Sequence, residues 1–166
     1  SQEDSAIATS MEAIREGIDR ISRIMRALAS FSKKDSLVRS RTVLSELIEN
    51  MLIIFRSRIG DDVEVVTDIR LNKEVFCLEH QVQTAITNIF DNALYAVNAA
   101  DAGTKKKIII RCFEEEKHAV ISIENSGSSI DEKQVDLLFE PFYTSKEPDK
   151  ATGLGLAIAK AYVNEH

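Results

Sequence analysis

The sequence predicts an α+β domain, a two-layer α/β sandwich with helices on one face of a mixed sheet, preceded by one long helix. From residue 38 onward, segments with helical apolar spacing and β-rich segments occur in mixed order, which is typical of such a sandwich. Before residue 34, apolar residues repeat instead with the heptad spacing of a helix that packs on other helices. The 166 residues are enough for one domain and an additional element.

The composition is that of an ordinary globular protein. A net charge of −6, with no basic run longer than Lys105–Lys107, argues against nucleic acid as a partner. No apolar stretch is long enough to span a bilayer and no signal peptide opens the chain, so we expect a cytoplasmic domain without membrane contact, even if its parent protein is membrane-anchored. Cys77 and Cys112 lie far apart in apolar runs, which indicates buried thiols.

The N-terminal segment predicts one helix over residues 5–33. Its apolar residues step alternately by four and three positions, and they are Ile7, Met11, Ile14, Ile18, Ile21, Met25 and Leu28. A single helix cannot bury such a seam, so the pattern indicates a partner helix in a second copy or in a missing segment. The alternative is a helix that folds back on its own domain. The regularity of the repeat favours the homodimer.

The remaining elements follow from periodicity and turn residues. We expect strands at 38–42, 63–69, 75–78, 108–113 and 119–124, and helices at 45–58, 79–100, near 132–139 and from 157 onward. The last two strands are joined by the charged turn Glu114–Lys117, which predicts a hairpin.

A glycine pair leading into an apolar helix is the first candidate for a binding site. Gly153 and Gly155 precede Ala157–Val163, and the free N–H groups at a helix start can closely approach an anion. The aromatic loop before it, Phe139–Tyr143, ends in Thr144–Lys146 and suggests a mobile cover over a phosphate site. A plain turn is the alternative for the glycine pair alone.

The helix over 79–100 adds a polar stripe, formed by Gln81, Thr84, Asn88, Asn92 and Tyr95. Asparagine costs roughly half a kcal/mol relative to alanine inside a helix, so a plain surface would more cheaply carry Glu or Lys. Carboxamides suit a wall that offers oxygen to a metal and hydrogen bonds to phosphate, because a phosphate-bound Mg²⁺ takes only one or two protein oxygens. Two ordinary surface asparagines are the alternative.

The segment 121–130 predicts a strand that runs into a Gly/Ser turn. At its end, the Asn125 carboxamide can pair with a base edge, and Gly127 lets a planar ring lie against the backbone. Taken alone, an ordinary strand-to-loop turn explains this segment better.

Four motifs occur together and in order. They are N-x-x-x-N-A at Asn88–Ala93, the turn Asn125–Gly127, F-E-P-F-Y-T-S-K at Phe139–Lys146, and T-G-L-G-L-A-I at Thr152–Ile158. Over residues 38–166 the chain therefore resembles the catalytic, ATP-binding domain of a bacterial sensor histidine kinase, of the GHKL superfamily. The resemblance implies a sandwich of the Bergerat type, and the heptad helix resembles the second helix of the family's dimerisation and phosphotransfer hairpin.

The resemblance also implies the cofactors ATP and Mg²⁺ and the residues that hold them. Asn92 is the implied Mg²⁺ ligand, Asn125 stands where an Asp usually accepts the adenine amino group, and Phe139–Lys150 form the lid. The implied nucleotide-binding set is Asn88, Asn92, Tyr95, Asn125, Gly127, Ile130, Phe142, Lys146, Thr152, Gly153, Leu154, Gly155 and Leu156.

Position 88 favours a kinase over a hydrolase. In the superfamily's ATPases a water-activating Glu stands four positions before the Mg²⁺-binding Asn, whereas Asn88 cannot take a proton. General-base catalysis contributes a factor of about 10²–10⁴, so hydrolysis should be poor. Phosphoryl transfer to an imidazole needs mainly positioning and charge neutralisation.

The family's acceptor, a His followed by an acidic residue and a Pro, is not found at His80, His118 or His166. We therefore expect residues 1–36 to be the second half of the hairpin, whose first helix is absent, and 37–166 to be the kinase domain without its C-terminal hairpin. Expected partners are a second copy, a phosphoacceptor hairpin and a response-regulator receiver domain. The alternatives are a degenerate nucleotide-binding or dimerisation module without kinase activity, and an anti-sigma-like protein-serine kinase.

Overall fold

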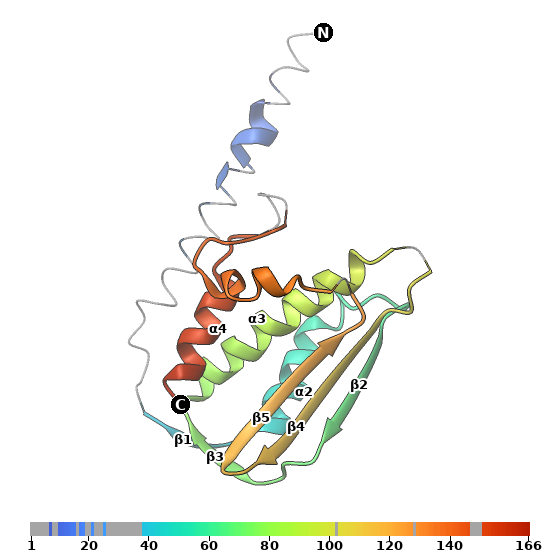
Figure 1. Cartoon of the computed structure of the whole chain (residues 1–166). Helices are drawn as coiled ribbons and strands as arrows, with labels where there is room; N and C mark the ends of the chain where they lie inside the picture. The colour runs from blue at the N-terminus through green and yellow to red at the C-terminus, as the bar shows by residue number, and fades with distance from the viewer. Residues whose placement is uncertain are drawn as a thin grey trace.

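Helices and strands segregate into two layers in the computed structural model, which describes residues 7, 10–15, 17–18, 21, 25, 38–101, 103–127, 129–146 and 151–166. Figure 1 shows the helices on one face of the sheet, with α4 beside α3. The elements are β1 (Ser40–Val43), α2 (Leu44–Phe55), β2 (Glu64–Ile69), β3 (Glu74–Cys77), α3 (Glu79–Asn98), β4 (Lys107–Glu115), β5 (His118–Asn125), the 3₁₀ turns η1 (Glu132–Gln134) and η2 (Leu137–Phe139), and α4 (Gly155–Asn164).

The sheet is mixed, as predicted. Among the described residues its strand order is β2-β4-β5, with β2 parallel to β4 and β4 antiparallel to β5. Strands β1 and β3 pair with each other in a separate antiparallel ladder, which the sequence did not predict. Alternate residues of β4, namely Ile108, Ile110 and Cys112, are fully buried at 0% exposure and point toward the helices. Their neighbours along the strand remain partly exposed.

Two apolar clusters hold the layers together. In the larger one, α2 and α3 pack on the sheet, and Phe55 meets Phe90 edge to face with 5.1 Å between ring centres. The smaller cluster joins α3 to α4 through Ala85, Leu154 and Ile158. The second cluster fixes the start of α4 against the middle of α3, and this junction forms the candidate site.

The short helix expected near 132–139 is replaced by the two 3₁₀ turns η1 and η2. Asp131 caps the first turn by accepting a hydrogen bond from the Lys133 N–H at 3.0 Å. Val135 and Leu137 are both 44% exposed, so this segment buries too little apolar surface to stabilise a regular α-helix.

The described residues of the N-terminal segment are helical, and every described member of the heptad seam is exposed by 58–67%. Leu28, the last residue of the seam, and the ends of the helix expected over 5–33 lie outside the described residues. In the part of the chain that the structure describes, no helix is long and apolar enough to cross a membrane.

Candidate nucleotide site

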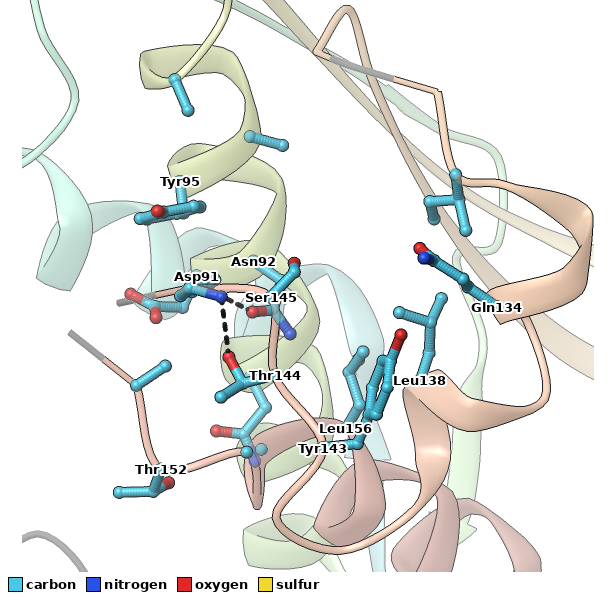
Figure 2. Close-up of a pocket in the computed structure, with 18 of the residues that line it drawn as sticks. Asp91, Asn92, Tyr95, Gln134, Leu138, Tyr143, Thr144, Ser145, Thr152 and Leu156 are labelled. Atoms are coloured by element: carbon cyan, nitrogen blue, oxygen red, sulfur yellow. Dashed lines mark hydrogen bonds between the residues drawn. The ribbon is translucent and has the colours of Figure 1, made fainter. Parts of the chain in front are cut away.

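A cavity of about 560 Å³ opens between α3, the loop after η2 and the beginning of α4. Figure 2 shows Asn92 and Tyr95 on the α3 side, with Thr144 and Ser145 on the loop that runs past them. Thr152 comes from the segment that leads into α4, and Leu156 from the first turn of α4. Residues of α3 and residues between positions 129 and 156, which are distant from α3 in the sequence, therefore line one cavity.

Helix geometry explains the wall formed by α3. Asn88, Asn92 and Tyr95 follow one another at steps of four and three residues, so they lie on one face of the helix. All three line the cavity, whereas the opposite face is buried in the core through Phe90 and Val97. Within the described residues, no group of three or more His, Cys, Asp or Glu side chains could hold a metal ion. A phosphate-bound Mg²⁺ does not require such a group.

Lys146 reaches across the cavity from the loop to α3. Its Nζ donates a hydrogen bond to Asn92 Oδ1 at 2.6 Å and lies 4.2 Å from the centre of the Tyr95 ring. Burial lowers the pKa of the Lys146 ammonium from its usual value, and the nearby Asp91 carboxylate partly opposes this effect. The loop is held locally by a hydrogen bond from the Lys146 N–H to Thr144 Oγ1 at 3.1 Å.

Asp91 is a cavity residue that our sequence reasoning missed. Its Oδ1 accepts a hydrogen bond from Arg58 Nη2 at 2.5 Å, and the Arg58 guanidinium lies 4.7 Å from the Phe55 ring centre. Asp91 is three residues after Asn88 and four before Tyr95, so the same helical spacing could have identified it. Gln134 of η1 also lines the cavity, and no motif pointed to it.

Gly153 brings the loop and the start of α4 together. Its φ is +69°, and a Cβ at this position would lie 2.4 Å from the carbonyl carbon of Phe142. The Phe142 N–H donates to the Gly153 carbonyl at 3.0 Å, and Phe142 itself has a φ of 70°. Both residues thus adopt the left-handed backbone region where their chains touch.

The first turn of α4 faces the cavity through Gly155 and Leu156. A Cβ at Gly155 would be 3.6 Å from the Asn88 side chain, which is an ordinary contact distance. The N-cap residue, Leu154, makes no side-chain capping bond. The free N–H groups of this turn and the positive end of the helix dipole therefore provide a site for an anion.

Most residues predicted for nucleotide binding meet at this cavity. Those that line it are Asn88, Asn92, Tyr95, Ile130, Lys146, Thr152, Gly153, Gly155 and Leu156. The others lie elsewhere: Leu154 is 2% exposed in the α3–α4 core, Phe142 is 64% exposed, and Asn125 is an exposed residue at the end of β5. Residues 147–150 of the expected lid are outside the described residues.

Gly127 does not line the cavity and instead packs against α3. A Cβ there would lie 2.6 Å from the Ala96 carbonyl oxygen, so glycine is required by this backbone contact. The preceding residue fixes the turn from the other side, since Ser126 Oγ accepts from the Lys107 N–H at 2.8 Å. The base-lining role implied for Gly127 stays a prediction.

Residues 77–166 match the family described as histidine kinase-, DNA gyrase B-, and HSP90-like ATPases. The chain belongs to this family. Membership in an ATPase family indicates an ATP-binding domain, and it confirms the resemblance predicted from the four motifs.

Two curated relatives are sensor proteins. The chain is 30% identical over 164 residues to the C4-dicarboxylate transport sensor protein DctB of Rhizobium meliloti, covering 96% of this chain and 25% of DctB. It is 27% identical over 160 residues to the signal transduction histidine-protein kinase AtoS of Escherichia coli, covering 94% of this chain and 25% of AtoS. The chain thus spans about a quarter of the length of these relatives.

Among solved structures, the mycobacterial sensor histidine kinase MprB has a TM-score of 0.67 and 27% identity, covering 78% of this chain and 80% of that chain. The histidine kinase ThkA, solved in complex with the response regulator protein TrrA, has a TM-score of 0.65 and 23% identity, covering 80% of this chain and 39% of that chain. The α+β fold with its mixed sheet is therefore that of histidine kinase catalytic domains.

Proposed function

We propose that this chain binds ATP and Mg²⁺ in the cavity between α3 and α4 and donates the γ-phosphoryl group to a histidine in two-component signal transduction. The observation that supports this most is the arrangement of two carboxamides, Asn88 and Asn92, opposite the glycine-flanked start of α4. One wall then offers oxygen to a metal, and the other offers N–H groups to phosphate.

The residues present fit a metal ion at Asn92. Its Oδ1 faces the cavity and already accepts a hydrogen bond from a cation, the Lys146 ammonium, at 2.6 Å. Asn92 and the phosphates would hold Mg²⁺, which neutralises phosphate charge during transfer. The Asn88 carboxamide would donate a hydrogen bond to a phosphate oxygen. Gly153 and Gly155, which lack side chains, would let the backbone approach the phosphates closely.

The neutral side chain at position 88 supports a kinase rather than a hydrolase. Among the described residues lining the cavity, the carboxylate is that of Asp91, and Arg58 occupies one of its oxygens at 2.5 Å. The Asn88 carboxamide itself cannot take a proton from water, whereas transfer to an imidazole depends mainly on positioning.

The acceptor imidazole comes from another helix. Both ring nitrogens of His166 are engaged, since Nε2 accepts from the Leu78 N–H at 2.9 Å and Nδ1 lies 2.7 Å from the Tyr162 carbonyl oxygen. His80 Nδ1 is 3.2 Å from Thr84 Oγ1, and His118 begins β5. We assign residues 1–36 to the second helix of a dimeric hairpin whose other helix presents the acceptor, and 37–166 to the kinase domain.

The heptad seam supports the homodimer, because the apolar side chains of its described members are 58–67% exposed in the single chain. The response-regulator complex of ThkA supports a receiver domain as the final acceptor of the phosphoryl group.

Isothermal titration of ATP·Mg²⁺ into the chain tests this function, with Asn92→Ala as the site variant. The parent chain should bind, and the variant should bind at least about tenfold more weakly in the presence of Mg²⁺. Absence of binding to the parent chain would leave only a degenerate module. Radiolabel transfer from ATP in the full-length protein identifies the acceptor, and labelling on Ser or Thr would exclude a histidine kinase.

A further inference from the structure

Lys146 is the single cation among the described residues that line the cavity. Its ammonium is not directed at the anion site formed by the start of α4. It points instead at Asn92 Oδ1, 2.6 Å away, which is the oxygen assigned above to Mg²⁺. An ammonium and a metal ion bound to the same carboxamide oxygen would repel each other at such short range, so the two cations compete for Asn92 Oδ1.

Tyr95 holds the ammonium in this position. The Lys146 Nζ lies 4.2 Å from the centre of the Tyr95 ring, within the range of a cation–π interaction. Asn92 and Tyr95 are three residues apart on α3 and therefore adjacent on one helix face. Asn92 provides a hydrogen-bond acceptor and Tyr95 an aromatic face, and together they hold the half-buried Lys146 side chain by two contacts.

We propose that Lys146 is a placeholder for the metal: it occupies Asn92 in the nucleotide-free protein and yields this oxygen to Mg²⁺ when nucleotide enters. Tyr95 is the positioning residue that keeps Lys146 on Asn92. The inference rests on the proposed function. The displaced ammonium is then free to pair with a phosphate oxygen. Lys146 thus leaves Asn92 Oδ1 and binds an oxygen of the nucleotide instead.

The placeholder has a measurable consequence for the metal dependence of binding. Without Mg²⁺, Lys146 is the cation available to the phosphates, so its loss should weaken binding strongly. With Mg²⁺, a variant without Lys146 also loses the phosphate contact. This loss of affinity is offset, because the metal no longer has to displace an ammonium from Asn92. A lysine that only binds phosphate would contribute under both conditions, and Mg²⁺ would reduce its contribution only as far as the metal neutralises the phosphate charge.

The experiment measures ATP affinity of the chain by calorimetry, once in EDTA and once in Mg²⁺, for the parent and for Lys146→Met. The variant keeps the aliphatic stem on Tyr95 but removes the charge. We expect a loss of about tenfold in EDTA and less than about threefold in Mg²⁺. Lys133→Met, an exposed lysine of η1 that does not line the cavity, is the matched control and should change neither affinity.

A second measurement needs no nucleotide. The side-chain NH₂ signals of Asn92, recorded by ¹⁵N–¹H NMR in the free chain, should shift in Lys146→Met and in Tyr95→Leu. They should shift little in Tyr95→Phe, which keeps the aromatic face, or in Lys133→Met. Together these variants distinguish the loss of the Lys146 contacts to Asn92 and Tyr95 from a general rearrangement of the loop.

The outcomes distinguish the inference from the function on which it rests. Equal losses of ATP affinity in EDTA and Mg²⁺, or unchanged Asn92 signals in Lys146→Met, would overturn the placeholder and leave the proposed function intact. No ATP binding by the parent chain would overturn both.

Discussion

Gly153→Ala should destabilise the chain, whereas Gly155→Ala, two residues away in the same motif, should not. At Gly153 the φ of +69° costs an L-residue about 1–2 kcal/mol. The added Cβ would also lie 2.4 Å from the Phe142 carbonyl carbon, so one of the two backbones has to move.

That movement strains the hydrogen bond from the Phe142 N–H to the Gly153 carbonyl, now 3.0 Å. A typical hydrogen bond contributes about 0.5–1.5 kcal/mol. The combined loss in the free energy of unfolding is therefore about 1.5–3.5 kcal/mol. At Gly155, a new Cβ meets the Asn88 side chain at 3.6 Å without a clash, and alanine is the better helix former.

Urea denaturation followed by circular dichroism measures both variants, which suits a chain without tryptophan. The reasoning would be refuted if Gly153→Ala changed the unfolding free energy by less than about 0.5 kcal/mol, a typical surface effect. It would also be refuted if Gly155→Ala were equally destabilising. The loss in the free energy of unfolding would then not arise from the backbone conformation and close contact of Gly153.

Three further predictions concern the core, the surface charges and the heptad seam. Phe90→Ala, at a residue with 0% exposure, should cost about 3–5 kcal/mol by urea denaturation, whereas Ile53→Ala at 70% exposure should change little. Hydrogen bonds from Arg70 lower the pKa of Asp68, so its contribution to stability is present above the unfolded-state pKa and lost as pH falls through the folded-state value; Asp68→Asn should therefore show a smaller drop in melting temperature on acidification. Ile14→Asp should convert the proposed homodimer to a monomer in sedimentation velocity, with Ile53→Asp as the control.

Sequence periodicity predicted the parts of this fold that local geometry decides. The two faces of α3 follow from a repeat of 3.6 residues, which separates Asn88 and Asn92 from Phe90 without knowledge of the neighbours. Likewise the two β-rich segments and the charged turn between them predicted the β4–β5 hairpin. The same spacing would have added Asp91 to the site if it had been applied to every residue of the stripe.

Features that depend on distant contacts could not be predicted in this way. The pairing of β1 with β3 joins segments more than thirty residues apart, and neither strand carries a signal that names its partner. The segment around η1 and η2 has helical apolar spacing, but Val135 and Leu137 remain 44% exposed. The Lys146–Asn92 contact spans 54 residues of sequence and is visible only once the loop is folded against α3.

The glycines show most directly why a motif does not by itself define a binding site. Gly127, Gly153 and Gly155 each belong to a nucleotide-binding motif, yet an added Cβ would meet the α3 backbone at the first, the loop backbone at the second and only a side chain at the third. Two of the three are thus required by packing of the protein on itself. Such packing is part of the site's construction, because it sets how closely α4 and the loop approach α3. The requirement for glycine therefore follows from the position of the cavity walls, while the chemistry that we propose within them depends on Asn88, Asn92 and Lys146.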